Sequence, residues 1–312
     1  SSVTPALEAD TMKPTTRSIT VNGAQVSMLQ AGPTGATPAL LLHGGRTGQS
    51  PIAYGSHLWG KALQLLGADR PVVALDLPGA GGSDVVSPNQ LTIDGLREHL
   101  DQVIAALGFE KVHVVGHDIG GLAGLWLTLS SPRKIASLSI VASAMAPPMG
   151  DGLDDIVFQS VPAPLWSRES QFWAFDRLSY FHAHIDDGLL DACVAAGNGA
   201  PHRAAVAAMR DEAIRMRNFG IPAMKGKMWA ILRDKGIGVP TQLVWSDNDP
   251  LAARDGGNML FHILAEKQYA TYFHIINRAG SFAFREQPET FAEIVGSFHD
   301  GVDAMMPAKS AA

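Results

Sequence analysis

Short apolar runs, each leading into a glycine-containing turn, recur through the first half of the chain. Ala39–Leu42 is apolar throughout, and Val72–Leu77 and Val112–Val115 are apolar except for Asp76 and His113; stretches with helical periodicity follow them. A strand that is apolar on both faces is typical of a parallel sheet covered by helices on both sides. The pattern therefore predicts buried parallel strands in strand–helix units.

An Asn22-Gly23 pair separates two extended runs, Arg17–Val21 and Ala24–Leu29. Asn-Gly favours the left-handed backbone that a two-residue hairpin requires, so this segment predicts a β-hairpin ahead of the parallel strands. Further strands are expected at Ile135–Val141, Thr241–Trp245 and Ala270–Ile276. Two amphipathic helices have apolar faces at Leu96, Leu100, Val103, Ile104 and Leu107, ending at Gly108, and at Phe291, Ile294, Val295 and Phe298.

The alternation of strands and helices stops between Met145 and Gly238. This segment is mostly helical in pattern and rich in Trp, His and Met, so it is either an ordinary helical insertion or a lid over an apolar pocket. Its place inside a predicted α/β sheet favours the lid. We expect a tail at 1–16, a core at 17–144 and 239–304, and a helical lid at 145–238.

Composition excludes several classes of protein. The 312 residues are 46% hydrophobic and 17% charged, as in folded globular enzymes. The net charge is −6 without a basic tract, which argues against a nucleic-acid partner. Cys193 is the one cysteine, so neither an intrachain disulfide nor a multi-thiolate metal site can form. No run of 18 apolar residues and no signal-peptide core occurs, so we expect a cytoplasmic protein without membrane contact, and a homodimer stays open.

The most informative segment is Val114–Gly121, which reads VVGHDIGG. It places Asp118 between a strand and a helix, in the G-x-nucleophile-x-G pattern of a nucleophile elbow where serine is more usual. The glycines are needed because a tight turn leaves no room for side chains, and the helix N-terminus favours a carboxylate. The alternative interpretation is a glycine-rich turn capped by an aspartate.

Two other turns fit the same chemistry. Gly45 follows the first buried strand, where its N–H group and that of Ile119 can hold a developing oxyanion. The segment after the seventh strand holds two candidates for an acidic partner, of which Asp249 is preferred over Asp247. The glycine-rich turn at 77–84 is interpreted as a structural loop.

Together these segments resemble the α/β-hydrolase superfamily over about residues 17–300. The resemblance implies an α/β-hydrolase fold, with a mostly parallel eight-stranded sheet, helices on both faces and a lid after strand 6. The GHDIG motif is similar to the branch with an aspartate nucleophile, which includes epoxide hydrolases and haloalkane dehalogenases. In that branch the carboxylate attacks carbon to form an ester, and a histidine-activated water hydrolyses the ester. No metal or organic cofactor is implied.

One departure from the family pattern is sharp. The expected histidine lies in G-H-x-x-x-x-E-x-P, and this chain retains Gly280, Glu286 and Pro288 but has Ser281 at the histidine position. The serine is either an engineered substitution that stalls the enzyme or a natural variation, and the intact flanking motif favours the first. An aspartate is ionised at neutral pH, so Asp118 can still attack while ester hydrolysis fails.

The sequence identifies the residues that would select a substrate less clearly than the catalytic residues. The branch usually has Trp after the aspartate and proline in the oxyanion turn, and this chain has Ile119 and Arg46 at those positions. The oxyanion turn also resembles that of carbon–carbon bond hydrolases, which use a serine nucleophile. Candidate substrate-binding residues, each of which also has an ordinary structural interpretation, are His43, Arg46, His117, Trp166, Trp173, Tyr180 and Trp229.

The function expected is hydrolysis of a small apolar or aromatic substrate of the epoxide, carbon–halogen or ester type. Asp118 would be the nucleophile, Asp249 the acidic partner, and position 281 the place of the histidine. Two alternatives remain: a cofactor-free lyase, cyclase or C–C hydrolase-like enzyme with Asp118 as acid–base, and an inactive hydrolase fold that binds a ligand.

Overall fold

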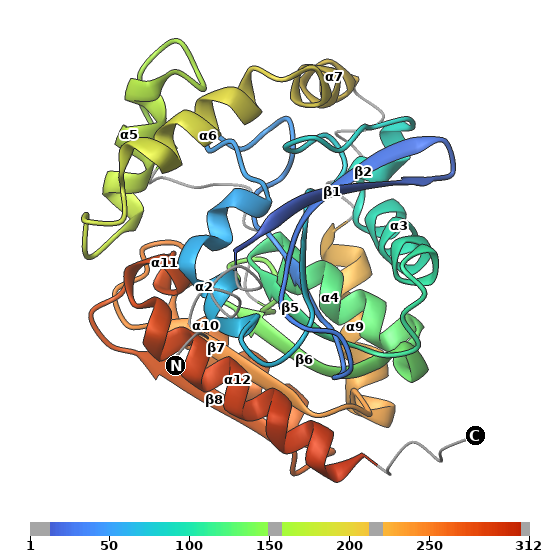
Figure 1. Ribbon diagram of the computed structural model, residues 1–312. Coiled ribbons are helices and arrows are strands. Elements are labelled where there is room, and N and C mark those ends of the chain that lie inside the picture. The colour runs from blue at the N-terminus through green and yellow to red at the C-terminus, as the bar shows by residue number, and fades with distance from the viewer. Residues whose placement is uncertain (1–12, 149–157, 212–220, 307–312) are drawn as a thin grey trace, which may run out of the picture.

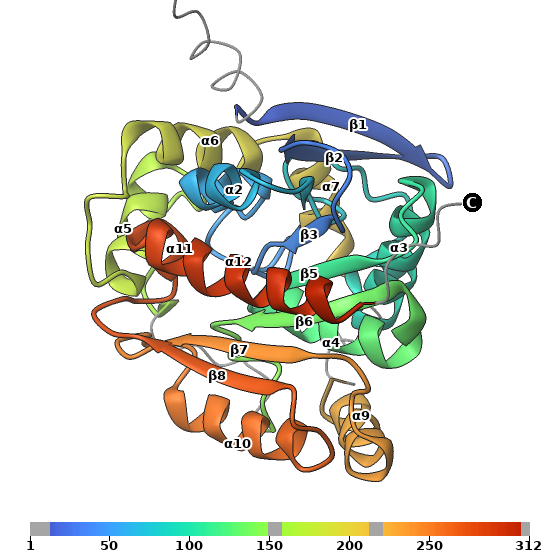
Figure 2. The ribbon, with the colours of Figure 1, turned by 60° about the horizontal axis from the view of Figure 1, so that its bottom comes forward.

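A single eight-stranded sheet forms the centre of the protein (Figures 1 and 2). The computed structural model describes residues 13–148, 158–211 and 221–306. The strand order is β1-β2-β4-β3-β5-β6-β7-β8, in which β1–β2 and β2–β4 are antiparallel and the other pairs are parallel. The strands are β1 Thr15–Val21, β2 Ala24–Ala31, β3 Ala39–Leu42, β4 Val72–Leu75, β5 Val112–His117, β6 Ile135–Val141, β7 Thr241–Ser246 and β8 Thr271–Ile276.

The expected hairpin joins β1 and β2. Asn22 and Gly23 have φ values of 49° and 81°, which is the left-handed backbone of a two-residue turn. The strand begins at Thr15, two residues before the expected start at Arg17, because the pairing with β2 extends to Gln30. The rest of the expected tail, up to residue 12, lies outside the described residues.

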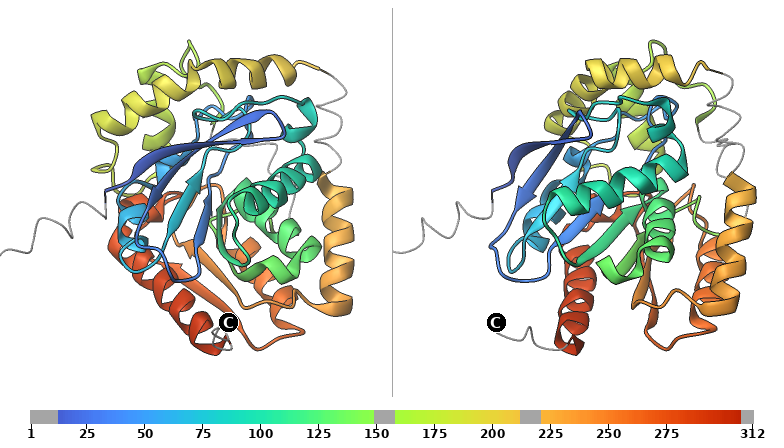
Figure 3. Two further views of the ribbon diagram at one scale, coloured as in Figure 1. Left: turned by 45° about the vertical axis from the view of Figure 1, so that its right-hand side comes forward. Right: turned by 90° about the vertical axis from the view of Figure 1, so that its right-hand side faces the viewer.

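Helices cover both faces of the sheet, as expected from the apolar strands (Figures 2 and 3). The face formed by α2, α11 and α12 lies opposite the face formed by α3, α4, α9 and α10. The helices are α2 Gly60–Leu66, α3 Ile93–Ala106, α4 Ile119–Ser130, α5 Arg168–Leu178, α6 Asp187–Gly197, α7 Ala200–Ala208, α9 Ile221–Lys235, α10 Arg254–Ala265, α11 Ala283–Glu286 and α12 Pro288–Met305.

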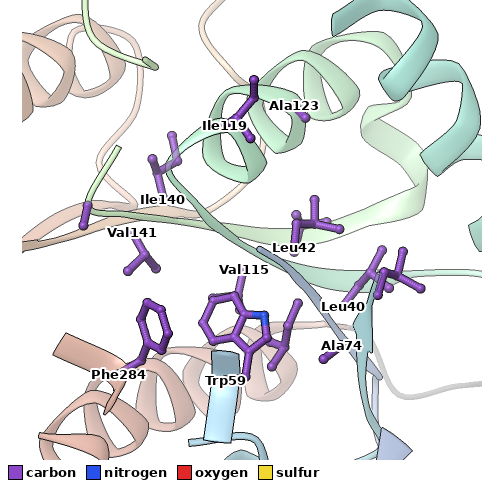
Figure 4. Close-up of a cluster of buried hydrophobic side chains, with 14 of the residues drawn as sticks. Leu40, Leu42, Trp59, Ala74, Val115, Ile119, Ala123, Ile140, Val141 and Phe284 are labelled. Carbon is purple, nitrogen blue, oxygen red and sulfur yellow. The ribbon is translucent and has the colours of Figure 1, made fainter. Parts of the chain in front are cut away.

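The core lies on both sides of the central strands (Figure 4). Ile119 and Ala123 of α4 pack on one side, and Trp59 and Phe284 pack on the other. Trp59 is fully buried, and its ring centroid lies 4.6 Å from that of Phe284. Burial on both faces explains why these strands are mostly apolar, and the packing holds the carboxyl ends of β3, β5 and β7 in fixed positions relative to one another.

The helices between β6 and β7 form two separate groups. α5, α6 and α7 form a group along one side of the molecule, whereas α9 packs against α4 and α10 of the core (Figures 1 and 3). Thus α9, which falls in the expected lid at 145–238, covers the sheet in this structure. Within the described residues, no helix combines the length and apolarity needed to cross a membrane.

Candidate active site

Asp118 lies at the sharp turn from β5 into α4. Its φ of 49° is in the left-handed region, which a residue other than glycine adopts only where the surroundings impose it. Glycines on both sides allow the close approach, because a Cβ on Gly116 would lie 2.3 Å from the Gly120 oxygen. A Cβ on Gly120 would lie 2.5 Å from the Leu42 oxygen. The GHDIG segment therefore has the geometry of a nucleophile elbow.

Backbone N–H groups converge on the Asp118 carboxylate. The Gly45 N–H group donates to Asp118 Oδ2 at 3.1 Å, and the Ile119 N–H group also hydrogen bonds to this carboxyl group. Gly45 has a φ of +76°, and a Cβ there would lie 2.2 Å from the Tyr54 ring, so glycine is required. The two N–H groups expected to form an oxyanion hole thus lie beside Asp118.

Burial raises the pKa of Asp118 above its usual value. The hydrogen bonds from the Gly45 and Ile119 N–H groups and the positive charge of Arg46 act in the opposite direction, because they favour the carboxylate. The Asp118 carboxylate is therefore poorly solvated, and it becomes a stronger base and nucleophile than a carboxylate in water.

Asp249 and Ser281 lie together after β7 and β8. The Ser281 hydroxyl donates to Asp249 Oδ1 at 2.5 Å, and the Leu251 N–H group donates to the same oxygen at 2.8 Å. The other candidate acid, Asp247, is exposed and pairs with Arg254 at 2.9 Å. Of the two candidates, Asp249 is thus the one beside position 281.

The two oxygens of the Asp249 carboxyl group differ in their hydrogen bonds. Its Oδ2 atom is buried and has no hydrogen-bond partner within the described part of the chain. Burial raises the pKa of Asp249 to about 6, with a further contribution from the negative charge of Asp118, although the hydrogen bonds from Ser281 and Leu251 oppose this shift. The two carboxyl groups of the site therefore interact electrostatically.

The loop that carries Ser281 is held from three sides. The Ser281 N–H group donates to the Leu178 carbonyl at 2.8 Å, and His117 Nε2 donates to the Ser281 carbonyl at 3.0 Å. The Gly280 N–H group donates to Glu286 Oε1 at 2.9 Å. The other oxygen of Glu286 accepts from the N–H groups of Tyr180 and Phe181, at 2.9 and 2.8 Å. The retained glutamate of the motif thus ties this loop to the chain after α5.

A cavity of about 440 Å³ opens onto Asp118. One part of its wall is polar, with Arg46 beside the carboxylate, and the other part is apolar. The polar lining residues are Arg46, Gln49, Ser50, Tyr54, Asp118 and Gln159. The other lining residues are Gly45, Pro51, Ala144, Met145, Phe158, Val161, Leu165 and Leu251. This size and mixed lining suit a small organic molecule.

The two histidines expected near the substrate have packing roles. His43 lies 2.8 Å from the Gly44 carbonyl through Nδ1 and accepts from the Leu77 N–H group through Nε2 at 3.0 Å. Burial lowers the pKa of His117 to about 3, so its ring is neutral. Neither ring lines the cavity.

The four aromatic residues expected to contact substrate lie outside the cavity lining. Trp166 supports the wall from behind, since its Nε1 donates to the carbonyl of the lining residue Ser50 at 3.2 Å. Trp173 packs under Arg177, Trp229 lies near Lys225, and Tyr180 is 43% exposed. Trp173 lies in α5 and Trp229 in α9, and helical periodicity does not say against which surface each helix packs; Trp166 and Tyr180 lie outside the helices.

Several lining residues carry no sequence signal. Gln49, Phe158 and Leu165 lie in irregular segments, and no motif spacing identifies them. Leu251 is two residues from Asp249, so its position in the loop after β7 is a sequence feature that could have identified it as a lining residue. Among the described residues, no group of three or more His, Cys, Asp or Glu side chains is arranged to hold a metal ion.

Known proteins match both the sequence and the fold. A family model described as the alpha/beta hydrolase fold matches residues 38–183, which contain Asp118 but neither Asp249 nor Ser281. RutD of Caulobacter vibrioides, named as a presumed carbamate hydrolase, is 35% identical over 122 residues, or 39% of this chain and 43% of that protein. The fluoroacetate dehalogenase of a Burkholderia species is 36% identical over 112 residues, or 34% of each chain. This chain therefore spans less than half the length of these relatives.

A solved structure matches almost the whole fold. It is the meta-cleavage product hydrolase CumD of Pseudomonas fluorescens, with a TM-score of 0.71 and 21% identity, covering 91% of this chain and 97% of that chain. The chain has the α/β-hydrolase fold, as its sheet order and elbow indicate. The family model and these relatives show similarity to the α/β-hydrolase superfamily over the parts of the chain that they match.

Proposed function

We propose that this protein is a hydrolase that acts on a small, largely apolar organic substrate through Asp118 as a nucleophile. The observation that carries the proposal is the Asp118 carboxylate, which lines the cavity and accepts the Gly45 N–H group. Relatives named as a carbamate hydrolase and a dehalogenase support hydrolysis of small molecules in general. Epoxides, alkyl halides and esters are the substrate types that a carboxylate nucleophile can attack.

The proposed reaction has two steps. The ionised Asp118 displaces halide from an alkyl halide and becomes an alkyl ester, or opens an epoxide to the same kind of ester while water protonates the alkoxide oxygen. With an ester substrate the carboxylate attacks the acyl carbon, the alkoxide leaves and takes a proton from water, and the intermediate is a mixed anhydride. In the second step water attacks the ester carbonyl, and the N–H groups of Gly45 and Ile119 stabilise the oxyanion. Ser281 cannot serve as a base near neutral pH, and loss of a general base costs about 10²–10⁴ in rate. With Ser281 at the histidine position, the reaction therefore stalls at the ester of Asp118.

An intact-protein mass measurement tests this proposal. The full chain is incubated with styrene oxide, 1-bromohexane or 4-nitrophenyl acetate, and the modified peptide is mapped. We expect an adduct of the probe's mass on Asp118 with at least one of the two alkylating probes, and no adduct in Asp118→Asn. Asp247→Asn is the matched control, because that side chain is exposed and pairs with Arg254. No adduct with any probe contradicts the nucleophilic role.

A second candidate is acid–base chemistry without a covalent step, as in a cofactor-free lyase or cyclase. It is favoured by the burial of Asp118, which raises the pKa of the carboxyl group and makes it a better proton acceptor. The two candidates differ in the fate of solvent oxygen. Product that forms in ¹⁸O-labelled water without label in either product or Asp118 would favour the second candidate.

A further inference from the structure

One buried hydroxyl group joins the turn after β6 to the turn that carries Asp118. The Ser143 Oγ atom donates to the Asp118 carbonyl oxygen at 2.7 Å and accepts the Ala146 N–H group at 3.0 Å. Ser143 is fully buried, and the Asp118 N–H group makes a second bond between the same segments, to the Val141 carbonyl at 3.0 Å. A buried hydroxyl that both donates and accepts holds its partners in one arrangement.

The Asp118 carbonyl oxygen accepts three hydrogen bonds. The N–H groups of Gly121 and Leu122 donate at 3.0 and 3.3 Å, as in the first turn of a helix, and the Ser143 hydroxyl gives the shortest of the three bonds. Because Ser143 follows β6, its bond fixes the direction of this carbonyl relative to the sheet. The left-handed backbone of Asp118, with a φ of 49°, persists only where such contacts hold it.

The peptide unit that contains the Asp118 carbonyl also contains the Ile119 N–H group. A trans peptide unit is planar, so its C=O and N–H groups point in opposite directions and rotate together. The Ile119 N–H group hydrogen bonds to the Asp118 carboxyl group. The direction of that N–H group therefore depends on the Ser143 hydroxyl, which binds the other side of the same unit.

The Ser143 hydroxyl also holds part of the cavity wall. Ala144 and Met145 line the cavity that opens onto Asp118, and the bond from the Ala146 N–H group to Ser143 Oγ closes a tight turn around them. The Ala144 N–H group is a further donor to the Asp118 carboxyl group. Ser143 is thus bonded to both segments that present these N–H groups to the carboxylate.

We propose that Ser143 is a positioning residue, which aims the Ile119 N–H group at the oxyanion of ester hydrolysis and holds Ala144 beside Asp118. This inference rests on the proposed function, because the oxyanion forms only if the Asp118 ester is made and hydrolysed. Ser143 does not line the cavity, so it acts through the peptide unit of Asp118 and Ile119. No bond to Ser143 forms or breaks in the reaction.

Adduct loss in two serine variants tests the proposal. Ser139→Ala is the matched control for Ser143→Ala, because Ser139 is also fully buried, pairs with Val115, and accepts from Gln242 Nε2 at 2.9 Å. Each full chain is loaded with styrene oxide or 1-bromohexane, excess probe is removed, and the mass is followed. Removing an oxyanion donor outright costs about 10²–10³ in rate, so a misdirected donor in Ser143→Ala should slow adduct loss by at least ~5-fold. Ser139→Ala should match the unmodified chain.

The titration of Asp118 is a second readout, and it does not need the reaction. The chain is labelled with carboxyl-¹³C aspartate, NMR follows the pH dependence, and Asp118→Asn assigns the signal. N–H donors favour the carboxylate, so their misdirection in Ser143→Ala should move the titration midpoint to higher pH, whereas Ser139→Ala should not. The charges of Arg46 and Asp249, which also act between these residues and Asp118, are the same in both variants. A serine that only fills space would leave the midpoint unchanged.

The outcomes separate this inference from the proposed function. An unshifted midpoint or an unchanged rate of adduct loss in Ser143→Ala overturns the inference and leaves the proposed function intact. No adduct in any form overturns the proposed function and the role at the oxyanion, and the midpoint then decides whether Ser143 positions the N–H groups. If urea unfolding shows that Ser143→Ala does not fold, Ser143→Cys replaces it, because a thiol is only a weak donor, and an unshifted midpoint there overturns the inference.

Discussion

Ser281 and Asp249 are 32 residues apart in the chain, yet the serine hydroxyl donates to Asp249 Oδ1 at 2.5 Å. The two residues follow β8 and β7, which are parallel neighbours, so the carboxyl ends of the two strands bring them together. The pair occupies the place where the family pattern puts a histidine and its acidic partner. The reactions that this chain can catalyse therefore depend on the Ser281 hydroxyl, which stands beside the Asp249 carboxylate in place of an imidazole.

Ser281→His should supply the missing base. With imidazole between Asp249 and the ester, we expect the steady turnover rate to be about 10²–10⁴-fold higher than in the unmodified chain, which has Ser281. Product formation with styrene oxide measures it, and Ser281→Ala, which lacks both hydroxyl and imidazole, is the comparison. Probe binding without turnover in Ser281→His would favour a ligand-binding role for the fold.

Gly45→Ala should slow the reaction at Asp118 by more than the added backbone strain alone accounts for. The φ of Gly45 is +76°, and a Cβ there would lie 2.2 Å from the Tyr54 ring. Gly23 has a φ of +81° but nothing within 4 Å of a Cβ, so Gly23→Ala is a matched control for strain alone. Left-handed backbone costs about 1–2 kcal/mol for a residue with a Cβ.

Rates of adduct loss and urea unfolding separate the two effects. We expect Gly23→Ala to lose stability only, whereas Gly45→Ala also slows hydrolysis of the Asp118 adduct because the N–H group that stabilises the oxyanion moves. Equal rates of adduct loss in the two variants would mean that the Gly45 N–H group does not assist the hydrolysis step.

Glu286→Ala should loosen the loop of Ser281. Its carboxylate accepts three N–H groups, from Gly280, Tyr180 and Phe181. A hydrogen bond to a charged group contributes about 1.5–3 kcal/mol, so we expect a loss of at least about 2 kcal/mol in the free energy of unfolding. Glu289→Ala, at an exposed residue that pairs with Lys61, should lose much less stability because surface ion pairs contribute little. Urea unfolding compares them, and similar losses would contradict the anchoring role.

His299 should make the protein sensitive to acid. Burial lowers the pKa of His299 well below its usual 6.5, and His113 and Arg70 lower it further while Asp303 opposes them. The folded protein thus keeps this ring neutral, whereas the unfolded chain binds a proton below about pH 6.5. Stability is complete above that pH and is lost as the pH falls through it, by up to about 1.4 kcal/mol per pH unit for one such group.

His299→Phe removes this proton uptake, along with two ring nitrogens that have no partner among the described residues. We expect the variant to gain stability relative to the unmodified chain as the pH falls from about 7 to about 5. Urea unfolding at several pH values measures the difference. Parallel curves of stability against pH for His299→Phe and the unmodified chain would refute the prediction.

The amino-acid sequence determined most of the fold and the principal pair of carboxylates. Apolar runs marked the buried strands, Asn22-Gly23 marked the hairpin, and the glycines around Asp118 marked a turn that few other sequences allow. These features are local, because steric limits and strand burial act on a few neighbouring residues at a time. The order of the motifs along the chain then placed Asp249 and position 281 at adjacent strand ends.

Only the tertiary structure decided what surrounds Asp118. Trp173 and Trp229 have the expected helical periodicity, yet they pack away from the cavity, while Phe158 and Leu165 from irregular segments line it. The burial of the Asp249 Oδ2 atom, which has no hydrogen-bond partner among the residues that the structure describes, is likewise a property of the packed site. Periodicity records that a face is buried, whereas the partner of that face depends on contacts between segments far apart in the chain.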